Sequence, residues 1–330
     1  MRRRDVVLLG AAALAAPRLA GAQQAERVRR IGYFTADTGS PEDLFGVQQT
    51  RALIEGLREF GWYDGRNISI EHRFSGNGRE RMRANAHELV AQQPDLIVST
   101  GGLQLAALLA ETRTIPIVFT NVSDPVASGF VESLGHPGGN ATGVGVNEAP
   151  IAGKWLELLK EIAPGITRVL VLMAAGSRPQ QILADAVVAA APSLDLPLVL
   201  ASLNEAGDYD REIGAFARES RGGLVALSNP ILGSNYARVH ALAAQYRLPA
   251  VYSYPIYART GGLLSYGPDN LALFRDVARH VDGILRGAKP GDLPVQQPTR
   301  FVLAVNLKTA KAIGLEVPQS ILARADEVIE

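Results

Sequence analysis

Apolar runs and helical periods alternate along residues 29–119 of the chain. The runs at 96–98 and 117–119 have no internal alternation, which is typical of parallel strands buried on both faces, and residues 103–110 between them have helical spacing. The preceding segments predict, in order, a strand at 29–34, a helix at 47–60, a strand at 68–74 and a helix at 79–92. Residues 29–119 therefore predict a lobe built on a parallel sheet with right-handed crossovers.

A second alternation of the same kind follows. It predicts a helix at 154–162, a strand at 169–173, a helix at 180–190, a strand at 196–200, a helix at 208–220, a strand at 224–227, a helix at 235–246 and a strand at 250–252. After these come an apolar strand between glycines at 261–267, a helix at 271–285, a linker at 289–294, a strand at 301–305 and a helix at 307–313. A second lobe built like the first is the simplest interpretation.

Residues 137–145 are the most turn-rich segment, and we interpret them as the approach to a hinge. With 330 residues the chain exceeds one ordinary core, so two domains are expected. We predict an α/β clamshell in which each lobe is a parallel sheet flanked by helices. Lobe 1 is predicted to comprise residues 23–144 plus 267–289, and lobe 2 residues 145–266 plus 290–330.

The first 22 residues predict a secretory signal peptide. Arginines at positions 2–4 precede an apolar run at 6–16, and Ala20-Gly21-Ala22 provides the small residues that a signal peptidase requires. Cleavage is expected near Ala22, after export by either the general secretory or the twin-arginine route. No later segment is apolar over a length that could span a bilayer, so a periplasmic protein is expected.

Charge and cysteine content narrow the function further. Lys plus Arg and Asp plus Glu are equal at 33 each, which argues against a nucleic-acid surface. The chain has no cysteine, and this excludes disulfides, thiolate metal sites, a cysteine nucleophile and a lipid-bearing cysteine. We therefore expect a free monomer in the periplasm.

Small polar residues follow the predicted strands of lobe 1. Because ligands bind at the carboxyl ends of strands in an open parallel sheet, these residues predict a crevice. The candidates for ligand binding in this lobe are Thr35, Thr100, Gly101, Gly102, Asn121 and Asp124. Backbone N–H groups at the two glycines would lie at a helix N-terminus, which suits a carboxylate. Asp124 precedes a proline, so a helix-capping role is an equal alternative.

Lobe 2 offers three further candidates at strand ends. Asn229 precedes Pro230 and can donate and accept hydrogen bonds, although the Ser228-Asn229-Pro230 sequence also fits a plain turn. Tyr252 and Tyr254 could stack on a ring in the cleft, and packing within the core is the alternative.

No motif in the chain predicts catalysis. Gly143-Val-Gly-Val-Asn-Glu lacks the third glycine of a dinucleotide fingerprint, and His87-Glu88 lacks the second histidine of a zinc helix. Neither a Gly-x-Ser-x-Gly elbow nor a phosphate loop ending in Gly-Lys-Ser or Gly-Lys-Thr occurs. We expect no catalytic residues, no cofactor and no metal.

A combination of motifs resembles one protein family. Besides the export signal, the motifs are Gly56-Leu57-x-x-x-Gly61-Trp62-x-x-Gly65-x-Asn67-Ile68, Ala91-x-x-Pro94-Asp95-Leu96-Ile97, Asp124-Pro125-Val126, Asn140-x-Thr142-Gly143, Asn229-Pro230, Gly262-x-Leu264-Ser265-Tyr266-Gly267 and Leu303-x-x-Asn306-x-x-x-Ala310. Together they resemble the periplasmic substrate-binding proteins of ABC transporters, and within them the group that includes tryptophan- and tyrosine-binding members. The resemblance covers residues 27–328. It implies a type I binding fold with three crossing segments, no catalysis, and delivery of a small ligand to a membrane permease.

This group often has Thr-Pro or Ser-Thr-Pro after the third strand, where this chain has Ser99-Thr100-Gly101-Gly102. The resemblance therefore leaves two ligand classes, an aromatic amino acid or another amino acid. We interpret the chain as a solute-binding protein that closes on its ligand and docks on an ABC permease in the inner membrane. The alternatives are a secreted α/β hydrolase or isomerase that uses Asp124 with a tyrosine, and a sensor subunit for a membrane receptor.

Overall fold

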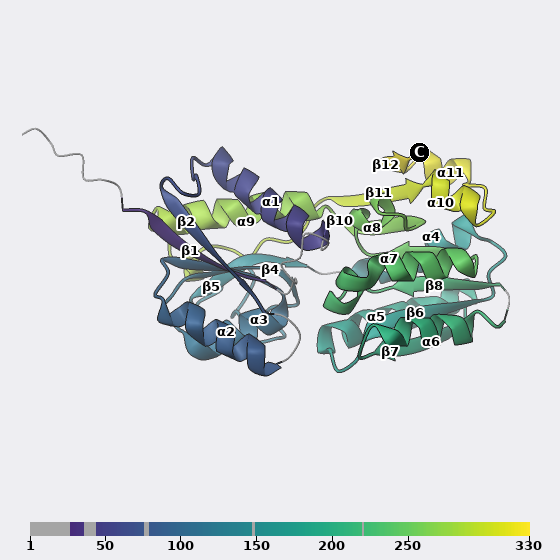
Figure 1. The fold of residues 1–330 in the computed structure, drawn as a ribbon, viewed down its shortest axis with the longest axis horizontal. Coiled ribbons are helices and arrows are strands. Elements are labelled where there is room, and N and C mark those ends of the chain that lie inside the picture. Colours follow the sequence, from purple (N-terminus) through teal and green to yellow (C-terminus); the bar gives the residue numbers. More distant parts are fainter. Residues whose placement is uncertain (1–26, 36–43, 76–78, 147–148, 220) are drawn as a thin grey trace, which may run out of the picture.

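The computed structural model describes residues 27–35, 44–75, 79–146, 149–219 and 221–330. Two α/β lobes lie side by side and are joined by the extended strands β10 and β11 (Figure 1). The predicted signal peptide at 1–22 lies outside the described residues.

The first lobe contains a parallel five-stranded sheet. Its strand order is β2-β1-β3-β4-β5, with β1 (Arg29–Thr35), β2 (Ile68–Phe74), β3 (Leu96–Thr100), β4 (Ile117–Ser123) and β5 (Ala141–Val146). One face packs on α1 (Leu44–Glu59) and α9 (Asn270–Leu285) through buried residues such as Leu53 and Phe274. The other face packs on α2 (Arg79–Ala91) and α3 (Gly102–Glu111). Helices on both faces explain why these strands are apolar without alternation.

The second lobe contains a sheet of seven strands in the order β12-β11-β10-β9-β8-β6-β7. The strands are β6 (Arg168–Ala174), β7 (Leu198–Leu203), β8 (Gly222–Ala226), β9 (Ala250–Tyr252), β10 (Leu264–Pro268), β11 (Phe301–Asn306) and β12 (Glu327–Ile329). β10 and β11 pair antiparallel, and the other pairs are parallel. The predicted pair of parallel-sheet α/β lobes is therefore confirmed, with one antiparallel pair added.

Helices cover both faces of this second sheet. One core includes residues of α4 (Ala152–Ile162), α5 (Arg178–Ala190), α10 (Leu307–Ala312) and α11 (Gln319–Leu322). The opposite core includes residues of α6 (Gly207–Phe216), α7 (Pro230–Gln245) and α8 (Pro255–Arg259). The 3-10 turns are η1 (Ala149–Ile151), η2 (Ala191–Leu194) and η3 (Pro290–Asp292).

The chain passes between the sheets after β5, after β10 and before β11, and these segments are bonded to one another. Gly145 N–H donates to the Gln296 carbonyl at 2.9 Å, and Gln296 N–H donates to the Gly143 carbonyl at 2.9 Å. The Trp155 indole N–H donates to the Tyr266 carbonyl at 2.6 Å, which fixes α4 against β10. The segment predicted as turns at 137–145 thus contains a buried strand, β5, because β4 supplies a pairing edge that sequence pattern cannot show.

Candidate functional site

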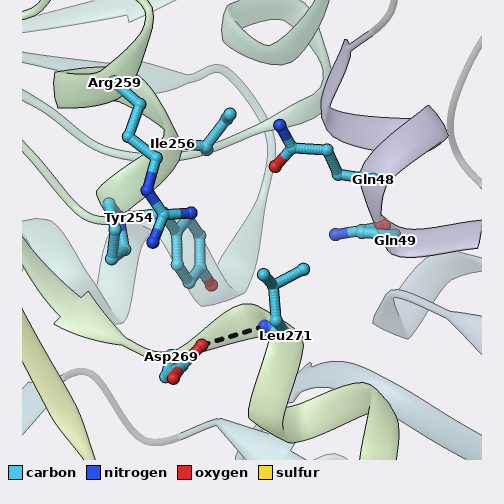
Figure 2. Close-up of a pocket in the computed structure, with 8 residues that line it drawn as sticks. Gln48, Gln49, Tyr254, Ile256, Arg259, Asp269 and Leu271 are labelled. Atoms are coloured by element: carbon cyan, nitrogen blue, oxygen red, sulfur yellow. Dashed lines mark hydrogen bonds between the residues drawn. The ribbon is translucent and has the colours of Figure 1, made fainter. Parts of the chain in front are cut away.

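A pocket lies where the two lobes meet. It encloses about 310 Å³ of empty space, part of which is open solvent. Its lining residues are Gln48 and Gln49 of α1, Leu271 at the start of α9 with its capping residue Asp269, and Tyr254, Pro255, Ile256 and Arg259 at α8. Figure 2 shows the glutamines on one side and the α8 residues on the other. A group bound there would contact both lobes at once.

Gln49 occupies the face of α1 that packs on the first sheet, four residues before Leu53. Only 5% of Gln49 is exposed, and its side-chain Nε2 has no hydrogen-bond partner among the described residues. A buried amide donor without a partner costs about 1–3 kcal/mol, so the structure contains an unmet donor at this pocket.

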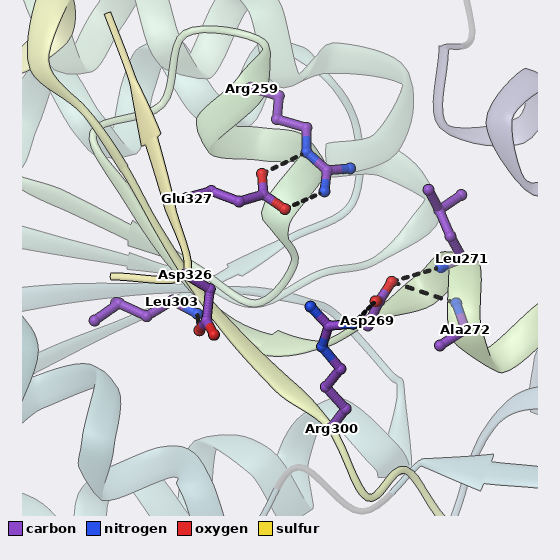
Figure 3. Close-up of polar contacts among 8 residues, drawn as sticks. All are labelled: Arg259, Asp269, Leu271, Ala272, Arg300, Leu303, Asp326 and Glu327. Carbon is purple, nitrogen blue, oxygen red and sulfur yellow. Dashed lines mark hydrogen bonds and ion pairs between the residues drawn. The ribbon is translucent and has the colours of Figure 1, made fainter. Parts of the chain in front are cut away.

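Arg259 is held in place from the second lobe. Its Nε–H donates to Glu327 Oε2 at 2.8 Å, and an Nη2–H donates to Glu327 Oε1 (Figure 3). The hydrogen bonds to Glu327 raise the pKa of Arg259, so the guanidinium remains charged. This two-point contact fixes the plane of the guanidinium at the pocket.

Asp269 joins the pocket to the crossing segments. Its Oδ1 accepts the N–H groups of Leu271 at 3.1 Å and Ala272 at 3.3 Å, which caps α9. Its Oδ2 lies 3.7 Å from Nη1 of Arg300, the residue before β11 (Figure 3). Asp269 therefore contacts the crossing after β10 and the one before β11.

Three threonines lie at the carboxyl ends of β1, β3 and β4. Thr100 pairs with Thr120, and Phe34 pairs with Ser99, which places Thr35 next to Thr100 in the register. Each is at most 5% exposed. Thr35 Oγ1 and Thr120 Oγ1 have no hydrogen-bond partner among the described residues. These hydroxyls provide a polar wall at the edge where ligands bind in such sheets.

Asn121 lies in β4, and Asp124 directly follows the end of that strand. Asn121 is in a left-handed conformation, with φ 55°, at the irregularity in the pairing of β4 with β5. Its Oδ1 is buried without a partner among the described residues. Asp124, with φ 41°, accepts the Ala127 N–H at 3.0 Å, which closes the turn after β4. No helix begins in the described residues between β4 and β5, so the helix-capping role that was one alternative for Asp124 is wrong.

Gly101 and Gly102 form the start of α3, and the N–H of Gly101 is already used. It donates to the Thr120 carbonyl at 2.8 Å, and Gly101 has φ 94°. The first-turn N–H groups that follow have no partner within the helix, as at any helix N-terminus. Any anion at this end would be held by Gly102 and its successors.

The predicted residues of lobe 2 also lie at the strand ends and are buried. Asn229 caps α7: its Oδ1 accepts the Leu232 N–H at 2.9 Å, and its Nδ2 donates to the Leu227 carbonyl at 2.9 Å. Tyr252 is 1% exposed and lies edge-on to His240, and burial raises its pKa. Of the nine candidate residues, Tyr254 is the one that lines the pocket between the lobes.

Four pocket residues were not among those predicted from the sequence, namely Gln48, Gln49, Arg259 and Asp269. Glutamine on an amphipathic helix gives no distinctive signal, and Arg259 acquires its role from Glu327, which is 68 residues away. Asp269 gave the clearest available signal, an Asp directly before a predicted helix.

Two features are absent from the described part of the chain. No group of three or more His, Asp or Glu side chains in it could hold a metal ion. Across the same residues, no helix is long and apolar enough to cross a membrane.

Comparison with known proteins identifies relatives over most of the chain. Residues 47–329 match the family described as ABC transporter substrate binding protein. A tyrosine-binding protein of Clostridioides difficile is 26% identical over 266 residues, which cover 81% of this chain and 76% of that protein. A conserved domain protein of Vibrio cholerae has 26% identity and a TM-score of 0.83, with 92% of this chain and 100% of that chain covered. A domain of Streptococcus pneumoniae in complex with L-tryptophan has 22% identity, the same TM-score of 0.83, and the same coverage of 92% and 100%.

Proposed function

The chain belongs to the ABC transporter substrate-binding protein family, and on that premise we propose that it captures an aromatic amino acid between its lobes and delivers it to a permease in the inner membrane. The family consists of substrate-binding proteins rather than enzymes. The observation that carries the proposal is the pocket lined by α1 from one lobe and α8 from the other. A ligand that contacts both lobes shifts an open and closed equilibrium toward the closed form.

Two relatives support the choice of ligand class. One is named a tyrosine-binding protein, and another was solved in complex with L-tryptophan. The pocket combines apolar side chains, Ile256 and Leu271, with amides and one charge of each sign, which suits a small molecule that is apolar at one end.

The proposed ligand-binding wall of lobe 1 comprises Thr35, Thr100, Gly101, Gly102, Asn121 and Asp124. Support comes from the unpartnered Thr35 Oγ1 and Asn121 Oδ1, which lie at the carboxyl edge of the sheet. In lobe 2 we propose direct contact through Tyr254, while Asn229 and Tyr252 hold the strand ends that carry it.

The proposed lobes are 23–144 plus 267–289 and 145–266 plus 290–330. The packing of α9 on α1 supports the return of the chain to the first lobe after β10. Export with cleavage near Ala22 and a monomeric periplasmic form are parts of the same proposal, and they rest on the basic and apolar pattern of residues 1–22.

Binding and turnover can be measured on the same sample. Residues 23–330 are titrated calorimetrically with each of the nineteen chiral L-amino acids of the standard set, and with glycine as the control that lacks a side chain. We expect heat of binding with L-tyrosine or L-tryptophan, a rise in melting temperature by mass action, and recovery of the amino acid unchanged by mass spectrometry. Absence of binding by any aromatic amino acid would contradict the ligand class, and chemical conversion with turnover would contradict the binding function.

A further inference from the structure

We propose that the pocket between α1, α8 and α9 recognises the zwitterionic head group of the amino acid, with Arg259 and Gln49 binding its carboxylate and Asp269 its ammonium group. The inference rests on the proposed function and names the residues that set its specificity. It places the carboxylate at the lobe junction rather than at the N-terminus of α3.

Arg259 has the donors that a carboxylate needs. Of its five N–H groups, the bonds to Glu327 use the Nε–H and one Nη2–H. The other three have no hydrogen bond to a described residue. Because Glu327 fixes the guanidinium plane, little further side-chain entropy is lost when a ligand carboxylate accepts from them.

Gln49 supplies a donor from the opposite lobe. It is 5% exposed, lines the same pocket, and its Nε2 lacks a partner among the described residues. In Figure 2 the Gln49 amide points toward the centre of the pocket. A carboxylate has two oxygens and can accept from both side chains, which would join α1 to α8.

Asp269 makes a plain anion a poor fit and a zwitterion a good one. Its Oδ1 accepts two N–H groups of α9, while Oδ2 faces Arg300 at 3.7 Å, and the Arg300 side chain is 68% exposed. Oδ2 therefore has unused acceptor capacity, and Asp269 is one of the residues that line the pocket. A carboxylate alone would be repelled by Asp269, whereas an ammonium group beside it satisfies that charge.

The N-terminus of α3 is less well prepared for a carboxylate. The Gly101 N–H, which would be its first donor, is bonded to the Thr120 carbonyl. In addition, the Gln104 side chain lies over Gly101, with Oε1 at 2.7 Å from the position of an added Cβ.

The test uses three ligands that share the tyrosine side chain and differ in their charged groups. These are L-tyrosine, tyramine, which lacks the carboxylate, and N-acetyl-L-tyrosine, which lacks the ammonium charge; if L-tryptophan binds more tightly, its matching derivatives are used. We expect the wild type to bind each derivative about a hundredfold more weakly than the parent amino acid, since charge-assisted hydrogen bonds are lost.

Variants then assign each charge to a residue. Arg259→Gln and Gln49→Met are expected to weaken L-tyrosine binding by about tenfold or more without weakening tyramine. Asp269→Asn keeps an N-cap residue on α9 and is expected to weaken L-tyrosine by about tenfold without weakening N-acetyl-L-tyrosine. Arg238→Gln removes an arginine paired with Asp210 on the surface of lobe 2, away from the pocket, and serves as the matched control.

Four results would overturn the inference. Equal L-tyrosine affinity in Arg259→Gln and wild type would do so while leaving the binding function intact. Loss of L-tyrosine and tyramine binding to the same extent in Arg259→Gln would assign this arginine a structural role instead. If Gly102→Asp weakened L-tyrosine binding while Arg259→Gln and Gln49→Met bound it as tightly as the wild type, the carboxylate would be assigned to the N-terminus of α3 instead. Failure of the wild type to bind any aromatic amino acid would remove the proposed ligand class together with this inference.

Discussion

Gly267 lies where two backbones approach at the lobe junction. A Cβ added there would be 1.6 Å from the Ser253 carbonyl oxygen, which cannot move without shifting the strand end after β9. We predict that Gly267→Ala lowers the free energy of unfolding by about 3 kcal/mol or more, because backbone overlap cannot be relieved by a rotamer change. Chemical denaturation of the unliganded protein measures this.

The matched control for that change is Gly233→Ala in α7. Apart from its chain neighbours and the nearby backbone of α7 itself, no atom of the described residues lies within 4 Å of a Cβ added at Gly233. Alanine is favoured over glycine inside a helix by about 0.5–1 kcal/mol, so this variant is expected to gain slight stability. A Gly267→Ala protein as stable as Gly233→Ala would contradict the close approach of the two backbones.

His240 predicts a dependence of stability on pH. Burial lowers its pKa from 6.5 to about 4, and its ring lies edge-on to Tyr252 and Tyr257. Between these two values the unfolded chain binds a proton that the folded chain does not, so stability falls as pH falls from about 6.5 to about 4, by about 3 kcal/mol.

His240→Phe keeps the ring contacts and removes the titration. The difference in unfolding free energy between wild type and His240→Phe should therefore change with pH over this interval and be constant above it. A difference that is independent of pH from 4 to 7 would show that His240 has a nearly normal pKa in the folded protein.

Helix α9 depends on its capping residue. Asp269 accepts the N–H groups of Leu271 and Ala272, and α9 packs on α1 and on the first sheet. We predict that Asp269→Ala lowers stability by about 1 kcal/mol and that Asp269→Asn stays within a few tenths of wild type, since both Asp and Asn are good caps. Thermal unfolding without ligand distinguishes them, and equal losses in both variants would make the Arg300 contact the source of stability instead.

The ends of helices α9 and α7 show when local sequence pattern is enough to predict where a helix begins and ends. The capping aspartate before α9 and the glycine after it delimit a helix predicted at 271–285 and observed at Asn270–Leu285. For α7 the prediction began at 235, whereas the helix begins at Pro230, because Asn229-Pro230 was interpreted as a turn. Proline at the first helical position has no N–H to leave unpaired, and Asn229 accepts the Leu232 N–H.

Closure of the two lobes is predicted for the whole molecule. Bonds connect the crossing segments, from Gly145 to Gln296 and from Asp269 to Arg300, so rotation of the lobes about these strands is the expected motion. We expect solution scattering to give a smaller radius of gyration at saturating L-tyrosine or L-tryptophan, with hinge freedom near 143–145 and 261–267. A radius that does not change at saturation would speak against the clamshell.

Export predicts the N-terminus of the mature protein. Residues 1–22 should be absent from protein recovered from the periplasm, which would then begin near Gln23, because Ala20-Gly21-Ala22 is the small-residue site after the apolar run. N-terminal sequencing checks this. Recovery of Met1 on periplasmic protein would contradict it.

Sequence pattern predicted the two α/β lobes, because strand and helix periodicity is local and recurs in both halves of the chain. The solute-binding class was implied by the resemblance of a combination of motifs to one family. The polar strand ends were also predicted from local pattern, since Thr35, Thr100 and Asn121 come within two residues of the end of an apolar run. The pocket at the lobe junction needed tertiary structure. Gln49, Arg259 and Asp269 are far apart along the chain, and they meet only because β10, β11 and α9 carry the chain across between the lobes. Their roles depend on distant partners and on burial, and neither leaves a periodic signal in the residues themselves.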